Sequence, residues 1–145
     1  MKKAFDREFC DCPRCRRLCQ GVPGWFMPGE ATKAAEYLKM DLILLFKDYL
    51  IIEYWVSSPE DILVLSPRTA RQDGKTMACW GDPLRDSPCK FLDESGCMLP
   101  LELRPIECAI TKCHKVFARN PREIIKDAWK ENQTEIDIVY PKEES

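Results

Sequence analysis

Apolar residues recur at helical spacing through one stretch of the chain, between residues 31 and 49. Spacings of four and three residues separate them, which places them on one face of a helix. These positions are Ala31, Ala35, Leu38, Leu42, Leu45 and Tyr49. The pattern predicts one long helix from about Glu30 to Tyr49.

Two shorter apolar stretches follow and have the composition of strands. Residues 50–56 and 62–65 are rich in β-branched, aromatic and other apolar types, and the segment between them, 57–61, supplies Ser, Pro, Glu and Asp. Strand-forming stretches joined by turn residues indicate a β-hairpin. Upstream, the glycines and prolines of residues 21–29 indicate a loop, in which we expect Trp25 and Phe26 to be core residues rather than to stack on a ligand.

The C-terminal half should consist of short strands and loops that carry Cys79, Cys89 and Cys97, because glycine and proline are frequent there. We expect a helix from Pro105 through Cys108 toward Lys115. The remaining residues, 134–145, are interpreted as a C-terminal tail that frays at its end.

One more helix is predicted shortly before that tail. Asn120, Pro121 and Glu123 form an N-terminal helix signature, and the apolar side that follows comprises Ile124, Ile125, Ala128 and Trp129. The fold class is therefore α+β, as a small, mainly helical domain with a β-hairpin and cysteine-rich loops closed around a metal centre. Residues 1–145 are interpreted as a single domain, since this length suits one core.

Composition narrows the functional classes. The 22 Lys and Arg residues nearly balance the 24 Asp and Glu residues, which argues against nonspecific nucleic-acid binding because phosphate attraction needs a basic surface. The N-terminus lacks the apolar segment of a signal peptide, and the longest apolar cluster, Leu42–Trp55, is too short to cross a bilayer. We therefore expect a soluble, cytoplasmic protein that does not enter a membrane.

The chain contains nine cysteines, an odd number that excludes complete internal disulfide pairing. They form two groups, Cys10, Cys12, Cys15 and Cys19 in the first and Cys79, Cys89, Cys97, Cys108 and Cys113 in the second. In a reducing compartment such a set is typical of metal or redox chemistry. Thiolates select zinc, iron–sulphur clusters or copper(I), and the single histidine, His114, is more typical of a solvated surface residue than of a ligand.

The spacing within the first group suits a metal site. Two cysteines in a Cys-x2-Cys turn, Cys12 and Cys15, can offer two sulphurs to one metal, and Cys19 would lie on the same helical face as Cys15. Two alternatives are that the cysteines are small buried core residues and that Cys12 and Cys15 form a thioredoxin-like redox pair. The latter normally needs a preceding strand, which the sequence does not predict.

These residues resemble a known family, the YkgJ-type cysteine-cluster proteins, which are zinc- or iron-chelating domains. The family pattern opens with C-x2-C-x2-C-C, matched by Cys12, Cys15 and Cys19. It closes with C-x-F-L, a further Cys and R-P-x-x-C, matched here by Cys89–Leu92, Cys97 and Arg104–Cys108. The resemblance covers about residues 12–113 and is most specific in its closing half. Leu18 replaces one family cysteine, while Cys10 and Cys113 lie just outside the pattern.

The expected metal ligands follow from the motif together with its neighbour, and they are Cys12, Cys15, Cys19, Cys89, Cys97, Cys108 and Cys113. Cys113 is the less secure member, because a regular helix would turn it about 140° away from Cys108. Cys79 is compatible with either a ligand or a buried thiol. Arg104 would either offset the charge of clustered thiolates or pair with Glu107.

The function predicted from this set is binding of zinc or iron through cysteines of both groups. A four-iron cluster needs only four thiolates, whereas two four-thiolate zinc sites would use eight of the nine cysteines, so we favour an iron–sulphur cluster over zinc. One alternative is an enzyme that uses the centre for redox or methyl-transfer chemistry; the resemblance implies it because such domains occur in flagellin lysine methylases. Another is a zinc-stabilised module that binds a protein partner.

Overall fold

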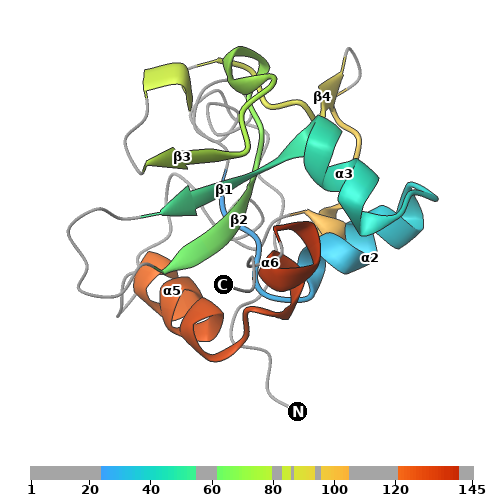
Figure 1. Cartoon of the computed structure of the whole chain (residues 1–145). Helices are drawn as coiled ribbons and strands as arrows, with labels where there is room; N and C mark the ends of the chain where they lie inside the picture. The colour runs from blue at the N-terminus through green and yellow to red at the C-terminus, as the bar shows by residue number, and fades with distance from the viewer. Residues whose placement is uncertain are drawn as a thin grey trace.

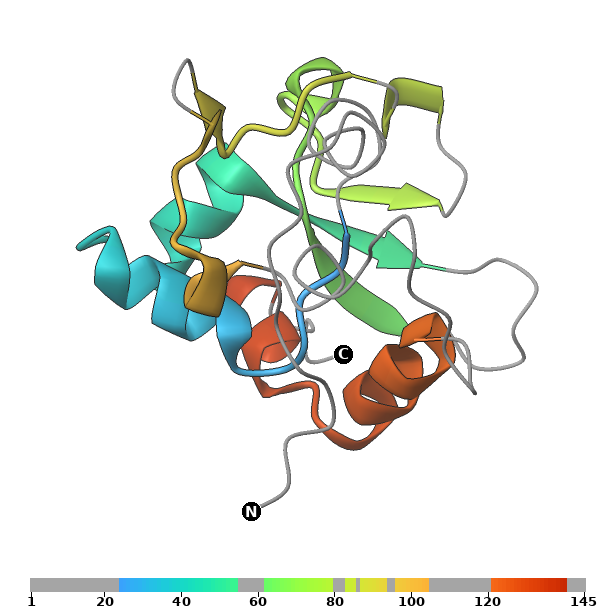
Figure 2. The ribbon, with the colours of Figure 1, turned by 180° about the vertical axis from the view of Figure 1, so that it is seen from behind.

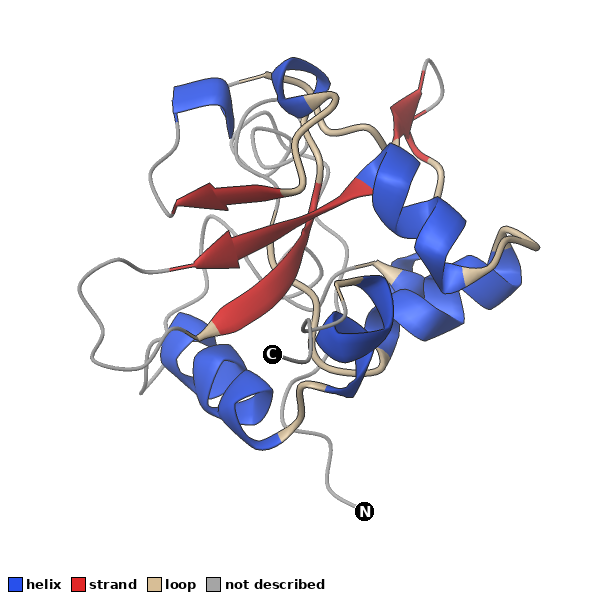
Figure 3. Cartoon of the chain, in the orientation of Figure 1, coloured by secondary structure: helices blue, strands red, loops and turns tan. Residues whose placement is uncertain are grey.

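A computed structural model of the chain describes residues 24–54, 62–79, 83–85, 87–93, 96–104 and 121–140. Within these ranges it is a small α+β structure with four helices and a three-stranded mixed sheet (Figures 1 and 3). The helices are α2 (Glu30–Tyr37), α3 (Leu42–Tyr49), α5 (Pro121–Glu131) and α6 (Thr134–Val139). The strands are β1 (Leu50–Tyr54), β2 (Leu63–Pro67), β3 (Met77–Cys79), β4 (Leu92–Asp93) and β5 (Gly96–Cys97). None of these helices combines the length and the apolar character that crossing a membrane would need.

The predicted pairing of residues 50–56 with 62–65 is confirmed. Strands β1 and β2 are antiparallel, in a register that places Leu50 opposite Pro67 and Tyr54 opposite Leu63. On its other edge β1 pairs with β3 in parallel, so the sheet order is β2-β1-β3. The connection between β1 and β2 lies outside the described residues.

Both faces of strand β1 are covered. Four successive residues, Leu50, Ile51, Ile52 and Glu53, are at most 1% exposed. Successive side chains of a strand point to opposite faces, so the sheet is covered on each side. The one carboxylate in this series, on Glu53, accepts a hydrogen bond from the indole N–H of Trp25 (3.3 Å). Trp25 and its neighbour Phe26 are fully buried, which confirms their prediction as core residues.

The predicted single helix from Glu30 to Tyr49 is wrong, because the chain breaks between α2 and α3. Lys39 takes a left-handed conformation with φ of 58°. The amide of Lys39 donates to the Glu36 carbonyl, and the amide of Met40 donates to the Ala35 carbonyl (3.1 and 3.0 Å). These two bonds make a Schellman termination, and the Asp41 carboxylate then starts α3 by accepting from Leu44 N–H (2.9 Å).

The apolar stripe nevertheless faces the core across the break. Ala31, Ala35 and Leu45 are buried, and Leu38, Leu42 and Tyr49 pack against the core from partly exposed positions. The spacing therefore identified the buried side of this region correctly. It missed the bend because a Schellman termination usually has glycine at the left-handed position, and here that position is a lysine.

The α5 helix begins at Pro121, as predicted, and its buried residues are Ile125 and Trp129. The expected capping residue, Asn120, lies outside the described residues. The indole N–H of Trp129 donates to the Phe26 carbonyl (2.7 Å). The side-chain amide of Gln133 donates to the Leu63 carbonyl of β2 (3.0 Å). Both bonds tie the C-terminal part of the chain to elements more than sixty residues earlier.

Residues 134–139 form helix α6, although the sequence places them in a C-terminal tail. The reason is a buried carboxylate, that of Glu135, which no periodicity marks. Its two oxygens accept from Gly29 N–H (2.7 Å), Thr32 N–H (2.8 Å) and the Thr32 hydroxyl (2.6 Å). A residue of α6 therefore caps the N-terminus of α2, where backbone amides have no helical partner.

The first prediction concerns Lys39, whose backbone has the left-handed conformation. Replacing Lys39 by Gly should raise the free energy of unfolding by about 1 kcal/mol, because glycine adopts this conformation without the Cβ clash. Urea denaturation measures the change. The matched control, Lys39→Ala, removes the same charged chain but keeps the Cβ, so its stability should stay within about 0.5 kcal/mol of the parent. Equal effects of the two substitutions would show that backbone strain at residue 39 is unimportant.

A second prediction concerns the carboxylate between α6 and α2. The Glu135→Ala substitution should lower the free energy of unfolding by about 3 kcal/mol, since three partly buried donors at the start of α2 lose a charged acceptor. Glu131→Ala, which removes an exposed carboxylate at the end of α5, should change it by less than about 0.5 kcal/mol. A loss of similar size in both variants would contradict the capping role.

Candidate metal-binding site

Two of the seven predicted ligands, Cys89 and Cys97, lie in the described part of the chain. The other five, Cys12, Cys15, Cys19, Cys108 and Cys113, lie outside it, as do Cys10, His114 and the helix expected from Pro105. Among the described residues, no group of three or more His, Cys, Asp or Glu side chains could hold a metal ion. The described part of the proposed site is therefore the closing half of the motif, which carries Cys89 and Cys97.

Cys89 and Cys97 both lie next to Leu92, Cys89 across a tight turn and Cys97 across the β4–β5 pair. The amide of Leu92 donates to the Cys89 carbonyl (3.0 Å), which closes a turn whose ends lie within about 7 Å of each other. Leu92 in β4 is also the antiparallel partner of Cys97 in β5. The bond from Met98 N–H to the Phe91 carbonyl (2.7 Å) flanks this pair, which is the pattern of a close pair about 4.5 Å apart at Cα. Two cysteines that are eight residues apart in sequence are thus brought next to one residue, Cys97 within the short hairpin and Cys89 in the turn that precedes it.

The thiol of Cys89 lies at the edge of the core. Cys89 is 7% exposed and belongs to the main apolar cluster, whereas Cys97 is half-buried. Cys89 forms an isolated antiparallel bridge with Thr69. The backbone bond beside it, from Lys90 N–H to the Arg68 carbonyl (2.8 Å), shows that Thr69 and Cys89 are a close pair with neighbouring side chains.

The Cys-x-Phe-Leu motif anchors this segment through its aromatic residue. Phe91 is 1% exposed, stacks on Tyr49 of α3 with ring centres 5.0 Å apart, and meets Phe26 edge-on at 6.3 Å. A buried ring between two cysteines fixes their backbone without supplying a ligand. The motif residue between Cys89 and Cys97 therefore has a packing role.

Cys79 lies elsewhere. It ends β3 on the outer edge of the sheet, and the end of β3 and the β4–β5 hairpin lie on opposite sides of the molecule in both views (Figures 1 and 2). Its side chain is half-buried, as is that of Cys97. Cys79 is therefore separated from the hairpin that carries Cys97.

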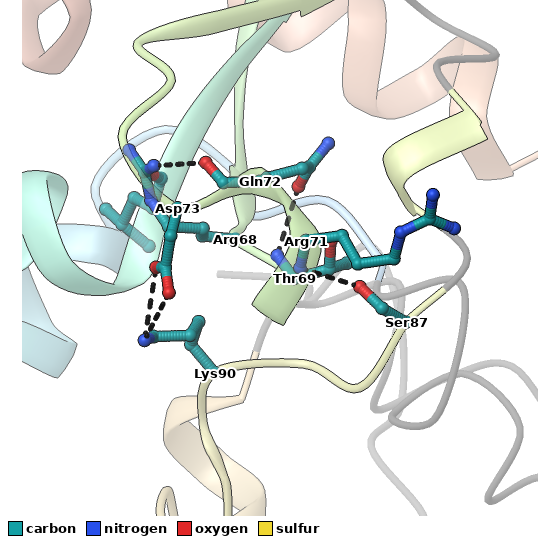
Figure 4. Close-up of polar contacts among 8 residues, drawn as sticks. Arg68, Thr69, Arg71, Gln72, Asp73, Ser87 and Lys90 are labelled. Atoms are coloured by element: carbon teal, nitrogen blue, oxygen red, sulfur yellow. Dashed lines mark hydrogen bonds and ion pairs between the residues drawn. The ribbon is translucent and has the colours of Figure 1, made fainter.

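A polar network supports the segment that leads to Cys89 (Figure 4). Its centre is Arg68, 2% exposed, whose guanidinium donates to two backbone carbonyls, those of Leu50 (3.0 Å) and Gln72. The amide of Thr69 donates to the Gln72 side chain (3.0 Å), and the Thr69 hydroxyl donates to the Leu84 carbonyl (2.7 Å). The 3-10 turn η1 (Ala70–Gln72) is thereby fixed to β1 on one side and to the approach to Cys89 on the other.

Two further contacts close the network. The amide of Arg71 donates to the Ser87 hydroxyl (3.0 Å). The ammonium of Lys90 lies 3.1 Å from one carboxylate oxygen of Asp73 and 3.3 Å from the other. This ion pair is partly exposed, and such pairs contribute little to stability. The buried bonds of Arg68 and Thr69 therefore provide most of the support.

Burial lowers the pKa of the Arg68 guanidinium from its ordinary value, while the carboxylates of Asp73 and Asp48 act in the opposite direction. Arginine starts from so high a pKa that it keeps its charge at neutral pH. A buried cation is therefore held by backbone carbonyl oxygens and by the field of two nearby carboxylates.

Arg104 also has a local structural contact. Its guanidinium Nε donates to the Leu99 carbonyl (2.9 Å), which closes the turn around η3 (Leu101–Leu103). Its other expected partner, Glu107, lies outside the described residues. The two roles predicted for Arg104, near thiolates or with Glu107, stay predictions.

Sequence reasoning missed Arg68, Thr69 and Gln72. Thr69 and Gln72 have the Thr-x-x-Gln spacing of a helix-start signature, which could have marked a fixed turn at this point. No comparable signal marked Arg68, because nothing local in the sequence distinguishes a buried arginine from the exposed ones.

No family model, no curated protein and no solved structure matches the chain significantly. The resemblance to the YkgJ-type family rests on the motif residues named above.

Proposed function

We propose that the protein binds zinc or iron through cysteine thiolates from both sequence groups. The observation that supports this most directly is that Cys89 and Cys97, the first two cysteines of the closing motif, both lie next to Leu92, Cys97 within the β4–β5 hairpin and Cys89 in the turn that precedes it. Four-thiolate sites need such pairs, because each short turn can contribute two sulphurs to one metal. The proposed ligands from the rest of the chain are Cys12, Cys15, Cys19, Cys108 and Cys113.

The donor set fits the proposed metals. Thiolates bind zinc and iron–sulphur clusters in preference to magnesium or calcium. The hairpin and the turn before it supply two thiols, so at least two further ligands come from cysteines outside the described residues. The metal would then connect the N-terminal cysteine group to the hairpin, which is the closed arrangement that we propose for the cysteine-rich loops.

Cys79 lies away from this hairpin, so it is not among the proposed ligands. Two four-thiolate zinc sites would require eight of the nine cysteines, including at least two of Cys10, Cys79 and Cys113, which lie outside the motif. One four-iron cluster requires four, and six motif positions are present. We therefore favour an iron–sulphur centre, which would supply one-electron transfer, over zinc.

The first test of this proposal uses two matched cysteines. Cys97 and Cys79 are both half-buried and both end short strands, so serine should be tolerated equally well at either position. Cys97→Ser should remove most of the bound metal and lower the melting temperature by more than about 5 °C, because binding energy is also folding energy. Cys79→Ser should keep both close to the parent values. Metal analysis and calorimetry measure the two effects, and equal metal content in the two variants would contradict a site at the hairpin.

The second test identifies the metal. Protein prepared without oxygen should be brown and contain about four iron and four sulphide per chain if it holds one four-iron cluster. Elemental analysis and a sulphide assay measure this. Stoichiometric zinc without sulphide would overturn the iron–sulphur assignment but keep the metal-binding function, whereas a metal-free protein would overturn both.

A further inference from the structure

Arg68 joins three parts of the molecule at one buried point. Its amide donates to the Tyr49 carbonyl at the end of α3 (2.7 Å), and its guanidinium donates to Leu50 at the start of β1 and to Gln72 in η1. Its own carbonyl accepts from Lys90 N–H, next to Cys89 (2.8 Å). The residue thus contacts the sheet, a fixed turn and the segment that carries a proposed ligand.

We infer that Arg68 is the positioning residue of the Cys89 thiol, holding the segment that carries it against the central sheet. The connection to a metal rests on the proposed function, but the placement of the thiol does not. The backbone on either side of Cys89 is held by the bond from Lys90 N–H to the Arg68 carbonyl and by the bond from Ala70 N–H to the Pro88 carbonyl (2.8 Å). Loosening Arg68 should therefore free this segment before it unfolds the rest.

The geometry requires an arginine rather than any cation. Nε and one terminal nitrogen of the same guanidinium donate to carbonyls of different elements, Leu50 in β1 and Gln72 in η1. A lysine ammonium is a point charge on a flexible chain and does not reproduce this fixed fork. The exposed Lys90–Asp73 pair joins the residue after Cys89 to the residue after η1 from outside, so it provides a matched contact of low energetic weight.

The test compares Arg68→Met, Arg68→Lys and the control Lys90→Met in the full-length protein as purified. Iodoacetamide alkylation at each cysteine is followed by mass spectrometry, with Cys79 as the internal reference. Arg68→Met should raise the rate at Cys89 about tenfold or more, since two buried carbonyls lose a charged donor. Arg68→Lys should show most of this increase, and Lys90→Met should change the rate by less than about twofold. If Arg68→Met does not fold, Arg68→Lys decides the question.

Urea denaturation separates positioning from general stability. If Arg68 is a positioning residue, Arg68→Met should raise the alkylation rate at Cys89 by a larger factor than it raises the equilibrium constant for global unfolding. A rise equal to the change in that constant, no rise at all, or full restoration by lysine would each overturn the inference.

Release of metal to a coloured chelator gives a second readout that depends on the proposed function. If the parent holds metal, Arg68→Met should release it about tenfold faster, and an unchanged release rate would overturn the inference for the metal site. If the parent holds none, the proposed function fails, while the alkylation rates still decide the role of Arg68.

Discussion

Burial of strand β1 on both faces and both edges is the constraint on which the rest of the structure depends. The strand pairs with β2 and β3, and its first four residues are almost completely inaccessible. A polar group near such a strand must find a partner inside the protein, because water cannot reach it. The Arg68 guanidinium meets this requirement at the Leu50 carbonyl, and the Trp25 indole does so at the Glu53 carboxylate.

The same constraint explains why distant segments are tied together by single polar side chains. Trp129 and Glu135 each bond to residues more than one hundred positions away, and Gln133 reaches the edge of β2. The entropic cost of closing a loop rises only slowly with its length. A few buried hydrogen bonds and apolar contacts can therefore hold these distant segments together. The segment from Trp25 to Thr32 is thereby fixed between β2 and the C-terminal helices.

Local patterns predicted the elements that local forces determine. The pairing of β1 with β2, the start of α5 and the buried side of residues 31–49 all follow from the spacing of apolar residues and from turn and capping signals. The break at Lys39 was missed because its left-handed conformation is imposed by packing on both sides and not by the residue itself. Helix α6 and the buried roles of Arg68 and Glu135 were missed for a related reason. Each depends on a partner far away in sequence, which no local window contains.

For the candidate site, the motif predicted the ligand residues and their spacing, but it could not predict how the β4–β5 hairpin and the segment before it are held in place. The structure supplies that part for Cys89 and Cys97. Phe91 anchors the hairpin in the core, and the network around Arg68 holds the segment that leads to Cys89 against the sheet. Two thiols held in this way lose little conformational freedom on binding a metal, so the entropic cost of assembling a site falls mainly on ligands from other segments.

This division has a consequence for the proposed metal centre. In such a centre, the fixed pair of cysteines raises the affinity for the metal. The cysteines from other segments couple metal binding to folding, because those segments become ordered when the metal binds. Changes in Phe91 or in the network around Arg68 should then alter how long a metal stays bound. Loss of a cysteine from another segment should instead alter whether the metal orders that segment. The buried position of Cys89 beside the half-buried Cys97 suits the first role, because a ligand protected by the core is released only when its own segment moves.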